Sequence, residues 1–350
     1  MADRILLVRL SAMGDIVFAS PLVSAFRRRY PDAGISWLVA EPFADLLACD
    51  PMIDEVIILP ARRWGRLLRE RRYLTLAREV RAFVTGLRRH RFDLAVDLQG
   101  LMKSGIWVGL SGASRRIGLG SREGSQHFMH QVIHRHGGRR ERIASEYLFL
   151  AGELGLPVDD FPMRVAVCPE AAARAATLVA EEVGEGPCGV ICPFTTRPQK
   201  HWTRARWLEL IPLLRERFGG PVVMLGGPGD TVPAADIAAA SGVVNLVGRT
   251  DIQMAAAVIS DARYLVGVDT GLTHMGLAFH RPTVCLFGST RPYIDTATPA
   301  GRVLYHDLDC APCRRRPTCD GAFTCMSGIQ AGEVIDLLED LLSPQAPAPP

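Results

Sequence analysis

The residue near the start of the chain whose chemistry is easiest to interpret is Asp15. It lies in the segment Ser11-Ala12-Met13-Gly14-Asp15, directly after the apolar residues 4–10. Ser11 can cap a helix that begins here, and Gly14 would let a ligand approach the backbone. A carboxylate in the first turn of that helix can remove a proton from a hydroxyl group, as a general base does. The alternative is that Asp15 only stabilises the positive end of the helix dipole.

A second polar segment covers residues 97–104 and follows another apolar run, residues 93–98. Gln99 and Lys103 lie on either side of Gly100. Polar side chains beside a glycine at the end of a strand favour a turn that lines a substrate site. The start of a helix with Lys103 in solvent explains the same residues equally well.

Two segments in the second half of the chain could bind a diphosphate or a nucleotide. Thr195, Thr196 and Lys200 follow the apolar residues 189–193 and supply hydroxyl groups and a positive charge, which would stabilise a diphosphate as it leaves. A lysine exposed to solvent is the alternative. Asp230 follows the glycine-rich residues 226–229, a weaker pattern that resembles a nucleotide-contacting turn.

The most specific pattern is Asp269-Thr270-Gly271, which follows the apolar residues 264–268 and precedes His274. The free N–H groups at the start of the next helix suit a diphosphate, and Gly271 permits its close approach. Asp269 can accept hydrogen bonds from a sugar or ribose hydroxyl, or orient neighbouring donors. His274 either belongs to this site or is a hydrogen-bonded histidine of the core.

All of these segments follow short apolar runs that alternate with longer helical patterns, which predicts α/β architecture with parallel sheets covered on both faces. The pattern restarts after Gly184-Glu185-Gly186-Pro187. We therefore expect two Rossmann-like domains, residues 1–184 and 188–342, whose sheets face each other across a cleft, and a disordered tail at residues 343–350. Ligands bind beyond the carboxyl ends of such strands. The expected strands are residues 4–10, 35–40, 55–60, 93–98, 189–193, 221–227, 264–268 and 283–287.

The distribution of charge indicates an acidic partner other than nucleic acid. The net charge is only +3, yet residues 62–91 contain eleven arginines and two glutamates. Arg62 and Arg63, with Arg122 after Gly120, are expected to bind an anionic acceptor or to face an anionic membrane leaflet. A solvated helix face is the alternative. The N-terminus has no signal-peptide pattern, and no run of about 18 apolar residues occurs, so we expect a cytoplasmic protein.

Four cysteines lie close together near the C-terminus, at Cys310, Cys313, Cys319 and Cys325. The first spacing suits a structural metal site with zinc or another metal, although the other spacings do not form a standard pair. Reduced thiols or two labile disulfides are the alternatives.

Residues 11–15, 195–202 and 269–274 together resemble the heptosyltransferases of glycosyltransferase family nine, and most closely its heptosyltransferase I members. The resemblance extends in the same order from the first strand to Gly288. Any one of the three motifs is moderately specific, whereas all three in order are strongly specific. Two features depart from the pattern: Asp230 holds the place of a glutamate that contacts the donor ribose, and the cysteine cluster is more typical of heptosyltransferase II and other members.

The resemblance implies a GT-B fold, an ADP-heptose donor, an acceptor of the Kdo-lipid A type and inversion at the anomeric carbon. By the family's pattern Asp15 is the base, and Lys200 contacts the donor phosphates together with Thr195 and Thr196. Asp269, Thr270, Gly271 and His274 fall at the donor site. No cofactor is expected for catalysis, and we expect peripheral contact with the cytoplasmic face of the inner membrane.

Other functions remain open at this point. A heptosyltransferase II-like enzyme, or another nucleotide-sugar glycosyltransferase, would use the same donor motifs with a different acceptor. A nucleotide-sugar epimerase on a similar fold would need no acceptor. A non-catalytic nucleotide-binding protein would not need Asp15 and Lys200 in one site.

Overall fold

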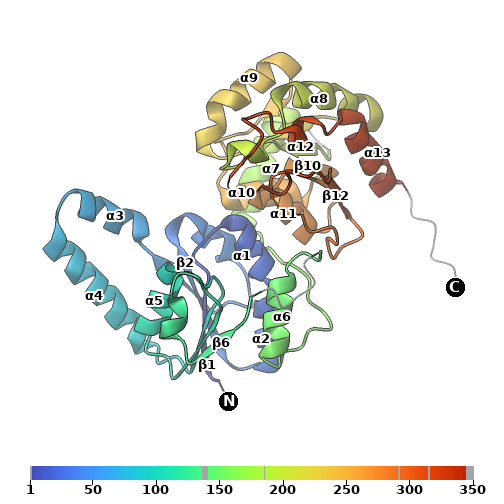
Figure 1. Ribbon diagram of the computed structural model, residues 1–350. Helices are drawn as coiled ribbons and strands as arrows, with labels where there is room; N and C mark the ends of the chain where they lie inside the picture. Colours follow the sequence, from blue (N-terminus) through green and yellow to red (C-terminus); the bar gives the residue numbers. More distant parts are fainter. Residues whose placement is uncertain (1, 136–140, 185, 291, 314–315, 344–350) are drawn as a thin grey trace. The chain divides into compact units, whose positions relative to one another are not determined.

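The computed structural model describes residues 2–135, 141–184, 186–290, 292–313 and 316–343. The chain forms two compact units (Figure 1). Unit 1 comprises Met1–Arg140 and Ala144–Ala166, and unit 2 comprises Glu141–Ile143 and Val167–Pro350. The expectation that the two units face each other across a cleft stays a prediction. The predicted disordered tail lies outside the described residues except for Ser343.

Unit 1 is built on a six-stranded, fully parallel sheet in the order β3-β2-β1-β4-β5-β6. Its strands are β1 (Arg4–Val8), β2 (Gly34–Ala40), β3 (Glu55–Leu59), β4 (Leu94–Asp97), β5 (Arg115–Leu119) and β6 (Gln131–Ile133). Its helices are α1 (Met13–Ala19), α2 (Pro21–Arg29), α3 (Ala61–Arg69), α4 (Tyr73–Arg89), α5 (Met102–Leu110) and α6 (Ser145–Glu153), with short 3₁₀ helices η1 (Glu41–Leu47) and η2 (Ser125–Phe128).

Unit 2 repeats this architecture with a second parallel sheet in the order β12-β11-β10-β7-β8-β9. Its strands are β7 (Gly189–Cys192), β8 (Val222–Met224), β9 (Val244–Asn245), β10 (Tyr264–Val268), β11 (Thr283–Phe287) and β12 (Gly301–Tyr305). Its helices are α7 (Pro169–Val183), α8 (Arg204–Phe218), α9 (Thr231–Ser241), α10 (Ile252–Ser260), α11 (Gly271–Ala278), α12 (Thr324–Ser327) and α13 (Ala331–Leu342), with 3₁₀ helices η3 (Pro198–Lys200) and η4 (Pro228–Asp230).

The central strands are apolar along their whole length because helices cover both faces of each sheet. Every residue of β10 and β11 is buried, as are four of the five residues of β1. Side chains on both faces of such strands are removed from water, which explains why these strands lack the alternating pattern of a half-exposed sheet. Strands and helices alternate along the chain in the structure, which confirms the predicted α/β class.

The predicted domain boundary at residues 184–188 is wrong. The chain passes from one unit to the other after Ala166, so α7 belongs to unit 2. Arg174 of α7 forms an ion pair with Asp251 at 2.6 Å, and the backbone N–H of Cys168 donates to Gln253 Oε1 at 2.8 Å. These bonds and the buried Ala171 and Ala175 fix the helix to the unit that follows it.

Within the described residues, no helix has the length and apolar character that crossing a membrane requires.

Candidate functional site

Each sheet has a central pair of strands at which the strand order reverses. In unit 1 the chain runs outward from β1 through β2 to β3, and then returns to β4 on the other side of β1. In unit 2 the equivalent pair is β7 and β10. In open α/β sheets, ligands bind outside the carboxyl ends of the strands at this switch point. The predicted residues at Asp15, Gln99, Lys200 and Asp269 all follow these four strands.

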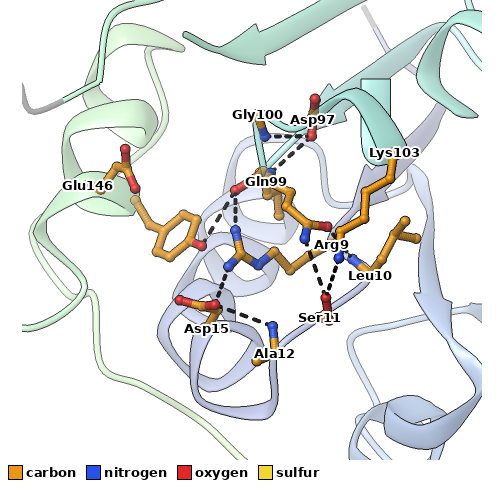
Figure 2. Close-up of polar contacts among 12 residues, drawn as sticks. Arg9, Leu10, Ser11, Ala12, Asp15, Asp97, Gln99, Gly100, Lys103 and Glu146 are labelled. Atoms are coloured by element: carbon orange, nitrogen blue, oxygen red, sulfur yellow. Dashed lines mark hydrogen bonds and ion pairs between the residues drawn. The ribbon is translucent and has the colours of Figure 1, made fainter. Parts of the chain in front are cut away.

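Asp15 is held by an arginine that the sequence patterns did not single out. Arg9 Nη2 forms an ion pair with Asp15 Oδ2, and Arg9 Nη1 donates to the carbonyl oxygen of Leu98 at 3.0 Å (Figure 2). Burial alone would lower the pKa of Arg9, but Tyr147 and Asp15 raise it above its ordinary value, so the guanidinium stays charged. The Asp15 side chain is 45% exposed, against 8% for Arg9. A carboxylate fixed by a buried cation is thus accessible to an incoming hydroxyl group.

Ser11 does not cap α1, contrary to expectation. The N-cap residue is Ala12, whose N–H donates to Asp15 Oδ2 at 3.3 Å. Ser11 Oγ instead accepts hydrogen bonds from Lys103 Nζ at 2.9 Å and from Gln99 Nε2 at 3.4 Å (Figure 2). The loops after β1 and β4 therefore share one polar network. It gathers the predicted acceptor-side residues of both loops beside α1, the helix that carries Gly14 and Asp15.

The turn after β4 is shaped by a buried aspartate and a required glycine. Asp97 Oδ1 accepts from the backbone N–H groups of Gln99 and Gly100, both at 3.0 Å, and burial raises the pKa of Asp97. Gly100 has φ +62°, and a Cβ there would lie 2.5 Å from Arg135 Nη2 and 2.9 Å from the Leu119 oxygen. Only glycine fits this backbone, and the turn in this way presents Gln99 toward Ser11.

The centre of the unit 2 site is an ion pair between Lys200 and Asp269. Lys200 Nζ lies 2.6 Å from Asp269 Oδ2, and both side chains are about 15% exposed. Burial alone would raise the pKa of Asp269, but the hydrogen bond from His274 and the positive charge of Lys200 hold it far below its usual range. The carboxylate is therefore ionised at every ordinary pH, and it fixes the ammonium group of Lys200 at the end of the loop that follows β7.

Two residues that the sequence patterns did not single out complete this network. Thr290 Oγ1 donates to Asp269 Oδ2 at 2.7 Å, and the Tyr293 hydroxyl lies 2.8 Å from His274 Nδ1. Burial raises the pKa of Tyr293 well above its ordinary value, so its hydroxyl stays protonated. When that hydroxyl donates to Nδ1, Nε2 of His274 is left to donate to Asp269 Oδ1, 3.3 Å away. His274 is thus a buried, hydrogen-bonded histidine that contacts Asp269, and its role in donor binding stays a prediction.

The loop after β7 approaches the loop after β10 through Thr195. Thr195 Oγ1 donates to the carbonyl oxygen of Asp269 at 3.3 Å, and His201 Nε2 lies 2.7 Å from the backbone carbonyl oxygen of Thr195. Helix α11 begins at Gly271 with Thr270 as its N-cap, and no side chain caps it. Its first N–H groups consequently follow closely after Asp269, the residue that pairs with Lys200.

Asp230 and Thr196 are less closely tied to this centre. Asp230 lies in η4 after β8 and accepts from the Gly227 N–H at 2.9 Å, so it stabilises its own turn. Thr196 is exposed in the loop after β7. The predicted contact of Asp230 with a ribose stays a prediction.

The predicted arginine sites lie on other elements of unit 1. Arg62 and Arg63 are exposed in the first turn of α3, which follows β3, two strands away from β1. Arg63 forms a two-pronged ion pair with Glu79, whose Oε1 lies 2.6 Å from Arg63 Nη2. Arg122 is exposed in the loop after β5. In the described part of the chain, no hydrogen bond or ion pair joins these arginines to the network around Asp15.

Metal binding at the cysteine cluster stays a prediction. Cys325 is buried in the core of unit 2 beside Met326, whereas Cys310 is exposed. In the part of the chain that the structure describes, no three His, Cys, Asp or Glu side chains are arranged to hold a metal ion. Metal binding by these thiols is therefore a prediction without support from the structure.

Comparison with known proteins gives the family of this chain. The model of glycosyltransferase family 9 (heptosyltransferase) matches residues 80–322. Lipopolysaccharide heptosyltransferase 1 of Pseudomonas aeruginosa is 31% identical over 90% of this chain and 87% of its own. Lipopolysaccharide heptosyltransferase 2 of Escherichia coli K12 is 24% identical over 97% and 98%.

A solved structure agrees with these relatives. The E. coli heptosyltransferase WaaC with ADP-2-deoxy-2-fluoro heptose superposes with a TM-score of 0.72 at 24% identity, over 96% of this chain and 99% of that chain. Each of the two units of this chain has the parallel sheet expected of a GT-B enzyme. This agreement confirms the predicted fold class. The chain belongs to glycosyltransferase family 9, the heptosyltransferase family, and is a glycosyltransferase.

Proposed function

We propose that this enzyme transfers a heptose from ADP-heptose, with inversion at the anomeric carbon, to an acceptor of the Kdo-lipid A type. The observation that carries the proposal is the Asp15 carboxylate, which a buried arginine fixes at the switch point of unit 1 while leaving it accessible. A non-catalytic nucleotide-binding protein would have no use for such a base.

Asp15 takes the proton of the acceptor hydroxyl group while the oxygen of that hydroxyl group attacks the anomeric carbon of the heptose. The bond between that carbon and the phosphate oxygen of ADP breaks, and ADP leaves with the bonding electrons. Lys103, which bonds Ser11, would neutralise an acidic group of the acceptor close to the attacking hydroxyl.

The residues of unit 2 would stabilise the leaving ADP. Lys200 supplies a positive charge, Thr195 and Thr196 supply hydroxyl donors, and the N-terminus of α11 supplies free N–H groups. Asp269 keeps Lys200 in place and balances its charge until the diphosphate arrives. These groups are fixed before the reaction, so little reorganisation is needed when charge develops on the leaving oxygen.

The name of the P. aeruginosa relative supports a heptosyltransferase I activity. This relative is more similar in sequence to this chain than the E. coli heptosyltransferase 2 is, which favours the first type of activity over the second. A direct test offers the purified enzyme ADP-heptose with two acceptors in competition. One acceptor ends in Kdo, and the other already carries its first heptose. Preferential transfer to the Kdo-terminated acceptor is expected. Preference for the heptose-bearing acceptor would assign the enzyme to the second type.

We further propose that the enzyme works at the cytoplasmic face of the inner membrane, because a lipid A acceptor is anchored there. The exposed arginines of α3 and α4 support this location.

A further inference from the structure

Three large apolar side chains are exposed around the turn between α3 and α4. Leu68, Tyr73 and Leu74 are 55%, 58% and 87% exposed, respectively. We call these three residues the hairpin tip. Figure 1 shows the two helices meeting at this turn. Exposed apolar residues scattered singly over a surface are ordinary, but three around one turn mark an interaction surface.

The hairpin itself is packed firmly on its inner side. Trp64 of α3 and Phe83 of α4 lie 5.4 Å apart, edge to face, and both contact Trp107 of α5 at similar distances. Leu67 and Leu87 are buried in the same core. The outward direction of the hairpin tip is thus a property of the folded unit, because the inner residues of both helices are anchored.

A shallow apolar groove continues from the hairpin tip along α4. It has a volume of about 590 Å³. Tyr73 belongs both to the groove and to the hairpin tip, and Leu76, Val80 and Val84 form the apolar lining along α4. Arg81 and Arg88 also line it and place two positive charges beside this apolar surface.

The same two helices carry an excess of positive charge. Residues 62–91 hold eleven arginines against two glutamates. Both glutamates already have arginine partners, since Glu79 pairs with Arg63 and Glu70 with Arg72. Arg66 and Arg69 are exposed on the α3 side of the hairpin tip. The surface around the three apolar side chains therefore attracts anions.

We propose that the hairpin tip docks this protein onto an anionic lipid leaflet. Leu68, Tyr73 and Leu74 enter the interfacial region, the groove along α4 accommodates part of an acyl chain, and the surrounding arginines contact lipid phosphates. Apolar side chains ringed by cations, with a tyrosine among them, fit a membrane interface. An acidic protein would satisfy the arginines but would leave Leu74 in water. This membrane-binding surface rests on the proposed function, which supplies the lipid-anchored acceptor.

The test is sedimentation of the full chain with vesicles. One set is phosphatidylcholine alone, and the other contains roughly a third phosphatidylglycerol, which gives the surface a negative potential. The double variant Tyr73→Ser/Leu74→Ser should bind the anionic vesicles about tenfold more weakly than the wild type, because two apolar side chains no longer leave water on binding. Val232→Ser, which removes an 81% exposed valine from α9, is the matched control and should bind like the wild type.

Three results would overturn the proposal. The first is equal binding of the double variant and the wild type to anionic vesicles. The second is wild-type binding that does not depend on phosphatidylglycerol. The third is a change in molecular mass by light scattering in the double variant, which would make a second copy of the chain the occupant of this surface. The single variant Leu74→Gln repeats the test at the most exposed position, where folding is least affected.

Activity on a deacylated, water-soluble acceptor separates this inference from the proposed function. The double variant should transfer heptose to that acceptor at the wild-type rate while its vesicle binding falls. If the wild type binds anionic vesicles through the hairpin tip but transfers no heptose to any acceptor, the proposed function fails and the docking surface stands.

Discussion

At the scale of single residues, we propose that the chemistry of the enzyme depends on two fixed pairs, Arg9 with Asp15 and Lys200 with Asp269. In each pair the partner holds the reactive group in one position. The Asp15 carboxylate remains accessible, as a base must, whereas Asp269 is buried, as suits a residue that positions a cation. The two aspartates accordingly have different roles although both follow the ends of parallel strands.

Replacement of Asp15 by Asn should lower kcat by about 10² to 10⁴ while leaving donor binding near normal, because only proton removal is lost. The measurements are the transfer rate and the affinity for ADP-heptose by calorimetry. Asp32→Asn, in an exposed turn before β2, is the matched control and should keep full activity. A fully active Asp15→Asn enzyme would remove Asp15 from the mechanism.

The depressed pKa of Asp269 predicts a stability change with pH. A carboxyl group whose pKa is lower in the folded state stabilises the fold above its unfolded pKa of about 3.9, and this contribution is lost as the pH falls below that value. Asp269→Asn should therefore be less stable than the wild type at neutral pH, by about 1–3 kcal/mol, because Lys200 loses its partner.

The difference between the two proteins should shrink as the pH falls from about 4 toward 2. Thermal unfolding across that range measures it. Asp261→Asn, at an exposed position of the same unit, serves as the control. A stability difference that persists unchanged at about pH 2 would contradict the assignment of the effect to the ionised carboxylate.

The sequence predicted Asp15, Lys200 and Asp269 as site residues. It did not predict Arg9, Thr290 or Tyr293, which contact the predicted residues. Asp269 could be found because it directly follows an apolar strand, and Asp15 and Lys200 because they lie in the polar segments that follow β1 and β7. Arg9 carried only a faint signal, a charged residue directly after the apolar residues of β1. Thr290 and Tyr293 carried none, because their approach to Asp269 and His274 depends on how the segment after β11 folds back.

At the scale of elements, the buried central strands were predictable and the outer ones were not. β10 and β11 were predicted with their observed bounds because continuous apolar residues mark them. The strands β5, β6, β9 and β12 were missed because they lie toward the sheet edges, are short or carry arginines. The boundary at residues 184–188 was wrong because a Gly-Pro turn marks the end of a helix as readily as the end of a domain.

The N-terminus of α11 and the positive charge of Lys200 predict that the donor phosphates need no divalent ion. EDTA should leave the initial rate of transfer intact, as measured by ADP release. A rate that falls with EDTA and returns with Mg²⁺ or Mn²⁺ would refute this prediction.

The first turn of α3 predicts a contact with the acceptor. Charge reversal at Arg62 and Arg63 should raise the KM for the acceptor more than the KM for ADP-heptose, because the arginines are expected to face its anionic groups. The effect should shrink with added salt, since exposed charges are screened over about 8 Å at physiological ionic strength. Steady-state kinetics at low and high salt measure both trends.

Glu79→Gln is the matched control for this helix. It releases Arg63 from its ion pair and should leave the acceptor KM unchanged or lower it. If the paired reversal has no effect on acceptor kinetics at low salt, the acceptor must instead be bound by the turn after β4.

At the scale of the whole molecule, the two units carry the same strand plan, and we propose that they divide the chemistry between them. Unit 1 holds Asp15, the proposed base, at its switch point, and unit 2 holds Lys200 and the N-terminus of α11 at its own. The family assignment agrees with this division, and we propose that the two sets of residues serve one transfer reaction.

Incubation of the purified enzyme with ADP-heptose and a Kdo-terminated lipid A acceptor tests that claim most directly. The mass of the acceptor and the amount of ADP are followed together. We expect the acceptor to gain the mass of one heptose for each ADP released, and neither change to occur when the acceptor is omitted. Consumption or epimerisation of ADP-heptose without a gain of mass by any core acceptor would contradict this expectation.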